Sequence, residues 1–248
     1  MLTQPTLEKL NAMRLGAMAH AWEHQKLQTA FAELGFDERF GLLVDAEFEA
    51  REDRGLGRRM REAKLRIGNA CIEDIQFEAK RGLDRGQIAQ LQTCQWVGDH
   101  RNVIVTGATG VGKTYMACAL AHQACRKGYR VIYARLPRLL DELAMSHGDG
   151  SFPRALAKLA RVNVLVLDDW GLKPIENQQQ RNDLLEVLED RYNLRSTIVT
   201  SQIPISKWHD LLGEPSIADA ILDRLVHNAY KLQLKGPSKR ITGEAKKN

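Results

Sequence analysis

The chain has 248 residues, of which 44% are hydrophobic and 27% charged, and its formal net charge is +5. These values are typical of a globular protein with one substantial core and, at most, a small extra domain. No segment approaches the roughly 18 apolar residues that a membrane helix needs, and the N-terminus has no signal-peptide pattern, so we expect a cytoplasmic protein without a membrane partner.

The N-terminal part of the chain is predicted to be helical. A break centred on Gly35 separates it from a second, highly charged helical segment, whose basic run at residues 58–61 is either a solvated face or a DNA contact. We expect a helical domain over residues 1–70 that makes oligomer, DNA or partner contacts. The residues that recur at helical spacing are Leu7, Leu10, Met13, Ala17 and Ala21.

From about Trp96 the pattern changes to short apolar strands that alternate with helices. This alternation predicts an α/β fold, with a parallel five-stranded sheet flanked by helices, over residues 71–248. The basic surplus also lies here, since residues 91–248 carry 22 basic and 16 acidic side chains, which admits nucleic acid as a partner. The predicted strands cover residues 102–107, 130–136, 162–169, 196–202 and 229–234.

The first of these strands runs directly into "GATGVGKT", which fits the phosphate-binding pattern G-x-x-x-x-G-K-[ST] at every fixed position. The glycines allow backbone N–H groups to surround phosphates, and the following helix N-terminus favours anions. Lys113 is predicted to reach the β and γ phosphates of ATP, and the Thr114 hydroxyl to bind Mg²⁺. The predicted nucleotide-binding residues are Gly107, Ala108, Thr109, Gly110, Val111, Gly112, Lys113 and Thr114.

The strand "VLVLDD" ends in two aspartates, 55 positions after Lys113. Alone, such a pair is more often a turn or a helix cap. A phosphate-binding loop, however, needs a second strand whose terminal carboxylate serves the magnesium ion. We therefore expect this strand to lie beside the strand at 102–107, with Asp168 on the magnesium side and Asp169 orienting the attacking water.

Three further residues, at two places in the chain, can each be interpreted in two ways. Ser201 and Gln202 follow the strand "STIVT" and are either sensors of the γ-phosphate or an ordinary polar strand end. Arg224 lies among apolar residues of a predicted amphipathic helix, and it is either a surface residue in a salt bridge or an arginine finger directed at a neighbouring subunit's nucleotide.

One metal-binding pattern is set aside. "HAWEH", which begins at His20 and ends at His24, matches the zinc-peptidase pattern H-x-x-E-H, but it lies in a short N-terminal helix without other peptidase features. We interpret both histidines as surface residues. The four cysteines form no C-x-x-C pair and suggest neither a zinc site nor a disulfide framework.

With these motifs in place, the chain closely resembles the IstB-like AAA+ ATPases, transposition helpers encoded beside the transposase of an insertion sequence, and more distantly the DnaC-type helicase loaders. The resemblance covers nearly the full length. It rests on "GFDERFGLLVDAEFEARE", "NVIVTGATGVGKTYMACALA", "VLVLDDWGLKPI", "TIVTSQIPISKWHDLL" and "AILDRLVHNAYKLQLKG".

The resemblance implies roles for individual residues. Lys113, Thr114 and Asp168 match the ATP and magnesium residues, Asp169 matches the water-orienting position, and Gln202 and Arg224 match the first sensor and the arginine finger. Two stretches depart from the family pattern. Relatives commonly have "TSN" where this chain has "TSQ", and "G-x-S-Y-R" where it has "GPSKR", which bears on Gln202 and on any nucleotide contact by Arg240.

The resemblance also bears on assembly and DNA. About 24 residues follow Arg224, too few for the helical lid that closes the nucleotide site in many AAA+ proteins. We therefore expect a homo-oligomer, as a ring or helical filament, in which a neighbouring subunit closes the site. In related initiators a helical insertion after the second strand turns toward DNA. The matching candidates for phosphate contacts here are Arg135, Arg138, Arg154 and Lys158.

These observations predict an AAA+ ATPase that oligomerises on duplex DNA, largely without sequence preference, and recruits or stimulates its cognate transposase. Asp169 is one methylene shorter than the Glu of many relatives, so we expect slow hydrolysis of ATP to ADP and phosphate. The alternative is a DnaC-type helicase loader acting on single-stranded DNA. A P-loop transferase ranks lower, because it would have no use for an arginine finger.

Overall fold

A computed structural model describes residues 3–77, 81–175 and 177–238. Contacts between Cα atoms divide the chain into two units, Met1–Arg58 and Arg59–Asn248. The division falls within one long helix, α3 (Phe36–Ala63). It is a division by contacts, and the functional boundary predicted near residue 70 stays a prediction.

The first unit is helical, and its helices are shorter than the sequence pattern suggests. Helices α1 (Thr3–Ala12) and α2 (Gly16–Leu27) are followed by a 3₁₀ helix (Thr29–Glu33) and by the first part of α3. Arg14 has a φ of 59°, a left-handed conformation that a right-handed helix cannot continue through, and this ends α1.

A buried carboxylate of α3 holds the N-terminus of α2. Glu47 accepts hydrogen bonds from the backbone N–H groups of Ala17 (2.9 Å) and Met18 (3.2 Å). It also pairs with Arg51 and Arg54. A carboxylate at this position satisfies N–H groups that the first helical turn leaves unpaired.

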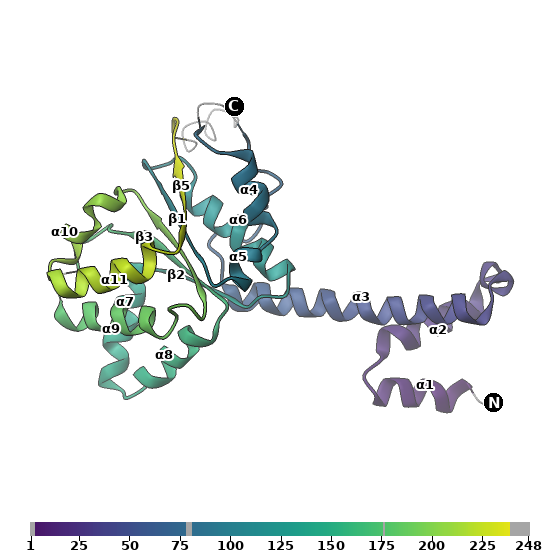
Figure 1. The fold of residues 1–248 in the computed structure, drawn as a ribbon. Helices are drawn as coiled ribbons and strands as arrows, with labels where there is room; N and C mark the ends of the chain where they lie inside the picture. The colour runs from purple at the N-terminus through teal and green to yellow at the C-terminus, as the bar shows by residue number, and fades with distance from the viewer. Residues whose placement is uncertain (1–2, 78–80, 176, 239–248) are drawn as a thin grey trace, which may run out of the picture. The chain divides into compact units, whose positions relative to one another are not determined.

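The second unit is built on a parallel five-stranded sheet with the order β2-β3-β4-β1-β5 (Figure 1). The α/β class and the parallel sheet are as predicted. The expectation that the aspartate strand β3 lies beside β1 is wrong, because β4 pairs with both and separates them. The strands are β1 (Asn102–Gly107), β2 (Val131–Arg135), β3 (Val164–Trp170), β4 (Ser196–Ser201) and β5 (Ala229–Leu234).

Helices cover both faces of this sheet (Figure 1). One face carries α4 (Arg85–Gln92), α5 (Gln95–Gly98) and α6 (Lys113–Arg126). The opposite face carries α7 (Leu136–Gly148), α8 (Phe152–Arg161), α9 (Gln178–Glu189), α10 (Trp208–Leu212) and α11 (Pro215–Val226), with a 3₁₀ helix (Ile205–Lys207) before α10. Within the described residues, no helix is long and apolar enough to cross a membrane.

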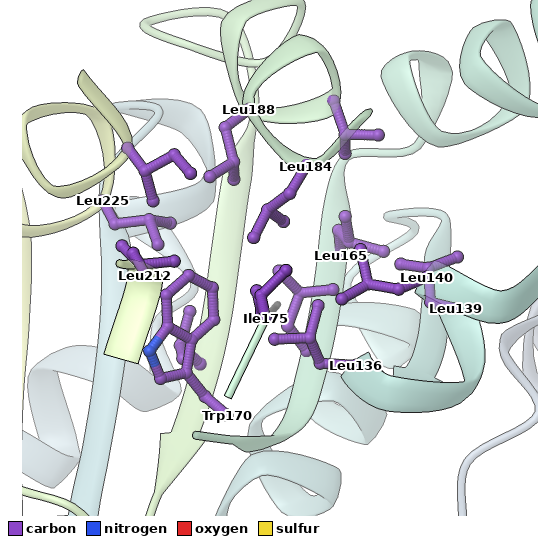
Figure 2. Close-up of a cluster of buried hydrophobic side chains, with 14 of the residues drawn as sticks. Leu136, Leu139, Leu140, Leu165, Trp170, Ile175, Leu184, Leu188, Leu212 and Leu225 are labelled. Atoms are coloured by element: carbon purple, nitrogen blue, oxygen red, sulfur yellow. The ribbon is translucent and has the colours of Figure 1, made fainter. Parts of the chain in front are cut away.

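An apolar core cluster lies between the sheet and helices α7 to α11, and Figure 2 shows part of it. Leu165 and Leu167 of β3 point into this cluster. Because successive strand residues point to opposite faces, Asp168 lies on the other face, under α6. Trp170 returns to the cluster and packs against Trp208, with ring centroids 5.0 Å apart. Apolar packing therefore anchors β3 on both sides of its acidic end.

Candidate nucleotide-binding site

The loop between β1 and α6 has the backbone that phosphate binding requires. Gly107 and Gly110 have φ values of 150° and 84°, a region that L side chains rarely adopt. A Cβ on Gly107 would overlap the carbonyl oxygen of Leu234, and one on Gly110 would overlap the side chain of Ser238. Lys113 folds back over the loop and donates from Nζ to the carbonyl of Ala108, at 2.8 Å. The loop thus needs glycine at both positions.

A cavity of about 730 Å³ opens in front of this loop. This volume is within the range of small-molecule sites. The phosphate-binding loop, the segment 66–76 and the carboxyl ends of β3 and β4 all contribute to its lining. Four cationic side chains face it, which suits a polyanionic ligand. They are Arg66, Arg81, Lys113 and Arg135.

Asp168 is fully buried at the base of this site. The Thr114 hydroxyl lies 3.1 Å from each of its carboxylate oxygens, and the Tyr133 hydroxyl donates to its Oδ2 at 2.5 Å. Thr200 donates a further hydrogen bond to Oδ1. Burial, together with the bond to Asp168, raises the pKa of Tyr133, which keeps the phenol protonated as a donor. A buried carboxylate with three hydroxyl partners is fixed in orientation.

Asp169 reaches the cavity because the strand bulges at this point. Leu167 pairs with Val199 and Trp170 with Ser201, so β3 has one residue more than β4 over this interval. Asp169 has a φ of 64°, a conformation that Asp tolerates better than most residues. Its Oδ2 lies 2.8 Å from the Arg135 Nε and 3.8 Å from the Arg66 Nη1. The bulge therefore directs two consecutive carboxylates to one site.

The end of β4 lies between the two motifs and contacts both. The Thr109 hydroxyl of the loop donates to the Gln202 Oε1 at 2.7 Å. Ser201 is buried and donates to the carbonyl of Trp170, at 2.9 Å. Of the two sensor candidates, Gln202 is therefore the one in contact with the phosphate-binding loop, while Ser201 holds the strand end. Their predicted roles stay predictions.

The oxygen groups at the base of the cavity fit a magnesium ion. Mg²⁺ in phosphoryl-transfer sites binds hydroxyl and carboxylate oxygens, usually one or two carboxylates together with the phosphates of the substrate. Thr114 and Asp168 supply such a pair. Among the described residues no group of three or more His, Cys, Asp or Glu could hold a metal ion.

Arg224 lies near the amino end of β1, and the phosphate-binding loop follows the carboxyl end of that strand. The backbone carbonyl of Arg224 accepts a hydrogen bond from the Asn102 side chain, at the start of β1. The phosphate-binding loop begins at the far end of that strand, about 16 Å away at 3.3 Å per residue. The guanidinium pairs with Glu189, and it also donates to the carbonyl of Ala220 at 2.8 Å. Arg224 is thus outside the reach of its own nucleotide site.

The four DNA-contact candidates lie in two different environments. Arg135 lines the nucleotide cavity and forms an ion pair with Asp169. Arg138 lies on the surface of α7, with its side chain 81% exposed and paired with Glu142. Arg154 and Lys158 are exposed on one face of α8. The predicted DNA contacts of all four stay predictions, and Arg240 lies outside the described residues.

Sequence reasoning missed several residues of the site. Tyr133 and Thr200 belong to strands that were predicted, and their alternation with apolar neighbours could have placed them on the face of Asp168. Arg81 is 8% exposed and donates to the carbonyls of Gln76 and Val111. Neither Arg81 nor Arg66 has a local pattern that distinguishes it from a surface arginine.

Comparison with known proteins agrees with this geometry. The family model described as IstB-like ATP binding protein matches residues 8–247. A protein of Sinorhizobium fredii (strain NBRC 101917 / NGR234), y4pL, whose name describes an insertion sequence ATP-binding protein, is 49% identical over 240 residues, 97% of each chain. The ATP-binding protein named for insertion sequence IS1162 of Pseudomonas fluorescens is 52% identical over 206 residues, 83% of this chain and 89% of its own.

Solved structures share the fold at lower identity. The crystal structure of DnaI superposes with a TM-score of 0.61 at 23% identity, over 74% of this chain and 100% of DnaI. The DnaC helicase loader superposes with a TM-score of 0.55 at 22% identity, over 67% of this chain and 97% of its own. Since a family model spans nearly the whole chain and relatives about half identical cover most of it, the chain belongs to the IstB-like ATP-binding proteins of insertion sequences.

Proposed function

We propose that this protein is an ATP-hydrolysing helper of transposition, which assembles on duplex DNA when it binds ATP and there recruits or stimulates the transposase of its insertion sequence. The observation that carries the proposal is the separation of Arg224 from the phosphate-binding loop by the length of β1. Arg224 and the phosphate-binding loop lie at opposite ends of β1 in one subunit. Arg224 can therefore reach a nucleotide only in a second subunit.

The residues of the cavity divide the chemistry of ATP hydrolysis among them. Lys113 and the loop N–H groups bind the phosphates, and Thr114 and Asp168 would hold a magnesium ion, which supplies charge neutralisation when bound. Asp169 orients a water molecule toward the γ-phosphorus. The water oxygen forms a bond to phosphorus as the bond to the ADP oxygen breaks, which gives ADP and phosphate. Gln202 contacts the loop near the terminal phosphate.

Arg224 of a neighbouring subunit completes the site. An arginine that arrives from outside stabilises negative charge on the phosphoryl group in the transition state. In the single subunit the guanidinium pairs with Glu189 and its side chain is 21% exposed, so the finger must leave this pair to reach a neighbour's site. Hydrolysis is therefore linked to assembly, and ATP binding promotes contact between subunits.

The basic face of α8 supports the DNA-binding part of the proposal. Arg154 and Lys158 are exposed, and α8 has no acidic residue. Arg138 of α7 extends the same stretch of chain but shares its charge with Glu142. Side chains of this kind contact phosphates and position a protein on DNA without reading its sequence. The resulting affinity falls steeply as salt rises.

Fluorescence anisotropy of labelled DNA tests the proposal. Duplex and single-stranded oligonucleotides are titrated with protein in the presence of ATP and Mg²⁺, of ADP, and without nucleotide. We expect tight binding to duplex only with ATP. The double variant R154E/K158E should lose this binding, while K127E, at the exposed end of α6, should retain it.

Three results would contradict the proposal. Preference for single-stranded DNA would favour a helicase loader, the function named for the structurally similar DnaC. Absence of DNA binding in every nucleotide state would exclude both the transposition helper and the helicase loader. Equal loss of binding in R154E/K158E and K127E would show that net charge, and not the α8 face, carries the interaction.

A further inference from the structure

Arg66 lies in a short segment that connects α3 to the sheet of the second unit. Lys64, with a φ of 50°, turns the chain away from the end of α3. Ala63 and Ala70 are fully buried on either side of the turn, and the Tyr115 hydroxyl, from the helix that follows the phosphate-binding loop, hydrogen-bonds the backbone of Cys71 at 3.3 Å. The backbone around Arg66 is therefore fixed against α6 at Tyr115, the residue that follows Thr114.

The guanidinium of Arg66 lies between the two catalytic carboxylates. Its Nη1 is 3.7 Å from the Asp168 Oδ2 and 3.8 Å from the Asp169 Oδ2. Charge-assisted hydrogen bonds are about 2.7–2.9 Å long, so neither contact is a closed pair. The Asp168 oxygens already accept from other donors, and the Asp169 Oδ2 is bonded to Arg135 at 2.8 Å. Arg66 is near both acids yet tightly bound to neither.

Arg66 also hydrogen-bonds the hydroxyl of Tyr133, a neutral partner, whereas the other cations of the cavity are bonded to carbonyls or to a carboxylate. Arg81 is buried and bonded to two backbone carbonyls, and Lys113 is bonded to Ala108. The Arg66 side chain remains 44% exposed toward the cavity. It combines a fixed backbone with a side chain that is partly exposed to the cavity.

We propose that Arg66 contacts the terminal phosphate of bound ATP and thereby distinguishes ATP from ADP within a single subunit. This inference rests on the proposed function, because it requires ATP in this cavity. Asp168 serves the metal and Asp169 the attacking water, and both therefore face the γ-phosphate. A guanidinium held between them lies beside that phosphate. Its planar fork matches two phosphate oxygens, and a lysine would lose this match.

The test measures nucleotide affinity and not turnover. A non-hydrolysable ATP analogue and ADP are titrated by calorimetry into the full-length protein and into R66A, R66K and R61A, with Mg²⁺ and again with EDTA. Arg61 is an exposed arginine at the end of α3 that does not line the cavity, so R61A is the matched control. Thermal unfolding of each variant checks that it is folded.

We expect R66A to weaken the ATP analogue about tenfold or more, with ADP changed by less than about twofold, which is the loss typical of a hydrogen bond to a charged group. The effect should persist in EDTA, because the contact is with phosphate. R66K should be intermediate, and R61A should match the wild type.

Other outcomes overturn the inference. Equal weakening of ATP analogue and ADP in R66A would make Arg66 a general support of the site, and unchanged affinities would exclude a contact. Tighter binding of the ATP analogue by R66A than by the wild type, in the presence of Mg²⁺, would mean that Arg66 competes with the metal for the carboxylates. If the wild type binds no ATP analogue, or if K113A binds it equally well, the proposed function fails first, and the inference falls with it.

Discussion

The Nε atom of Arg135 lies 2.8 Å from the Oδ2 atom of Asp169, and the two residues end neighbouring strands. This pair ties the carboxylate that we propose to orient water to a cation of its own subunit. We therefore expect R135A to release Asp169 and to raise basal ATP hydrolysis. The increase should be at most about fivefold, because an ion pair this exposed contributes no more than about 1 kcal/mol.

A steady-state phosphate-release assay without DNA measures this rate. R138A is the control, since Arg138 lies three residues away and pairs with Glu142 outside the cavity. A lower rate in R135A would show that Arg135 supports catalysis and does not restrain it. Unchanged DNA binding in R135A would remove it from the set of DNA contacts.

The D169N variant separates nucleotide binding from hydrolysis. Asparagine keeps the size of the side chain and tolerates the left-handed backbone at this position, where φ is 64°. We expect D169N to bind ATP and to assemble on DNA normally while hydrolysis falls at least about a hundredfold, because the water loses its orienting carboxylate. Wild-type turnover should lie below about 10 per second. Phosphate release and anisotropy of labelled duplex DNA measure the two activities on one preparation.

Mixing two inactive variants tests whether Arg224 acts on a neighbour. R224A retains an intact site and D169N an intact arginine, so an interface between them can hold one complete set of residues. An equal mixture should recover about a quarter of wild-type hydrolysis if subunits associate at random in a head-to-tail assembly. No recovery, with both variants still assembling, would argue that Arg224 has another role. R224A that hydrolyses ATP at the wild-type rate would exclude the role directly.

Arg191 is expected to stabilise the second unit. It is 1% exposed, and its guanidinium donates to the carbonyls of Leu159 (2.6 Å) and Val162 (3.0 Å) at the end of α8 and to the start of β4. Burial lowers its pKa to about 9, so it is charged at neutral pH. R191A leaves these carbonyls unpaired, and we expect a loss of about 3 kcal/mol in unfolding free energy.

Urea unfolding followed by tryptophan fluorescence gives this free energy. R191K retains the charge but has no planar fork, and it should lose most of the same stability. A loss confined to R191A would mean that charge or volume, and not the pattern of hydrogen bonds, matters at this position.

Glu47 should make the first unit sensitive to acid. Its hydrogen bond with Arg51 and the N–H groups at the start of α2 lower its pKa from 4.5 to about 2. Since the folded pKa is the lower one, its contribution is present above about pH 4.5 and is lost as pH falls toward 2. Hydrogen exchange in peptides from α2 should be faster in E47Q than in wild type at pH 7. After correction for intrinsic exchange, the difference should shrink at pH 3. A difference that is independent of pH would point to packing.

Local patterns predicted the parts of the fold that local residues determine. The strands at 102–107 and 229–234 match β1 and β5 to the residue, because glycine or polar residues bound each apolar run. The break at Arg14, where φ is 59°, had no such signal. Arginine has no local preference for a left-handed backbone, and the helical spacing that starts at Leu7 continues past this residue to Ala17.

Relations between distant segments were harder to predict. The loop before Lys113 and the pair at Asp168 are continuous motifs, but the position of β4 between their strands is a property of the whole sheet. Arg135 illustrates the same limit. Its place in the segment that matches the DNA-facing insertion of related initiators suggested a phosphate contact. In the structure its backbone is in register with Asp168 and its side chain pairs with Asp169. A single charged residue indicates its partner only once strand pairing is known.

The opposite placement of Arg224 and Gly107 across β1 gives each subunit two unlike sides. In the proposed assembly, copies that join through these sides all point the same way, so the assembly would be polar, with a front and a back. An open row then ends in one nucleotide site without an arginine and one arginine without a nucleotide site. Closure into a ring removes both ends. An open filament, by contrast, can grow at different rates at its two ends. A transposase could distinguish the two ends because one exposes a nucleotide site and the other an arginine.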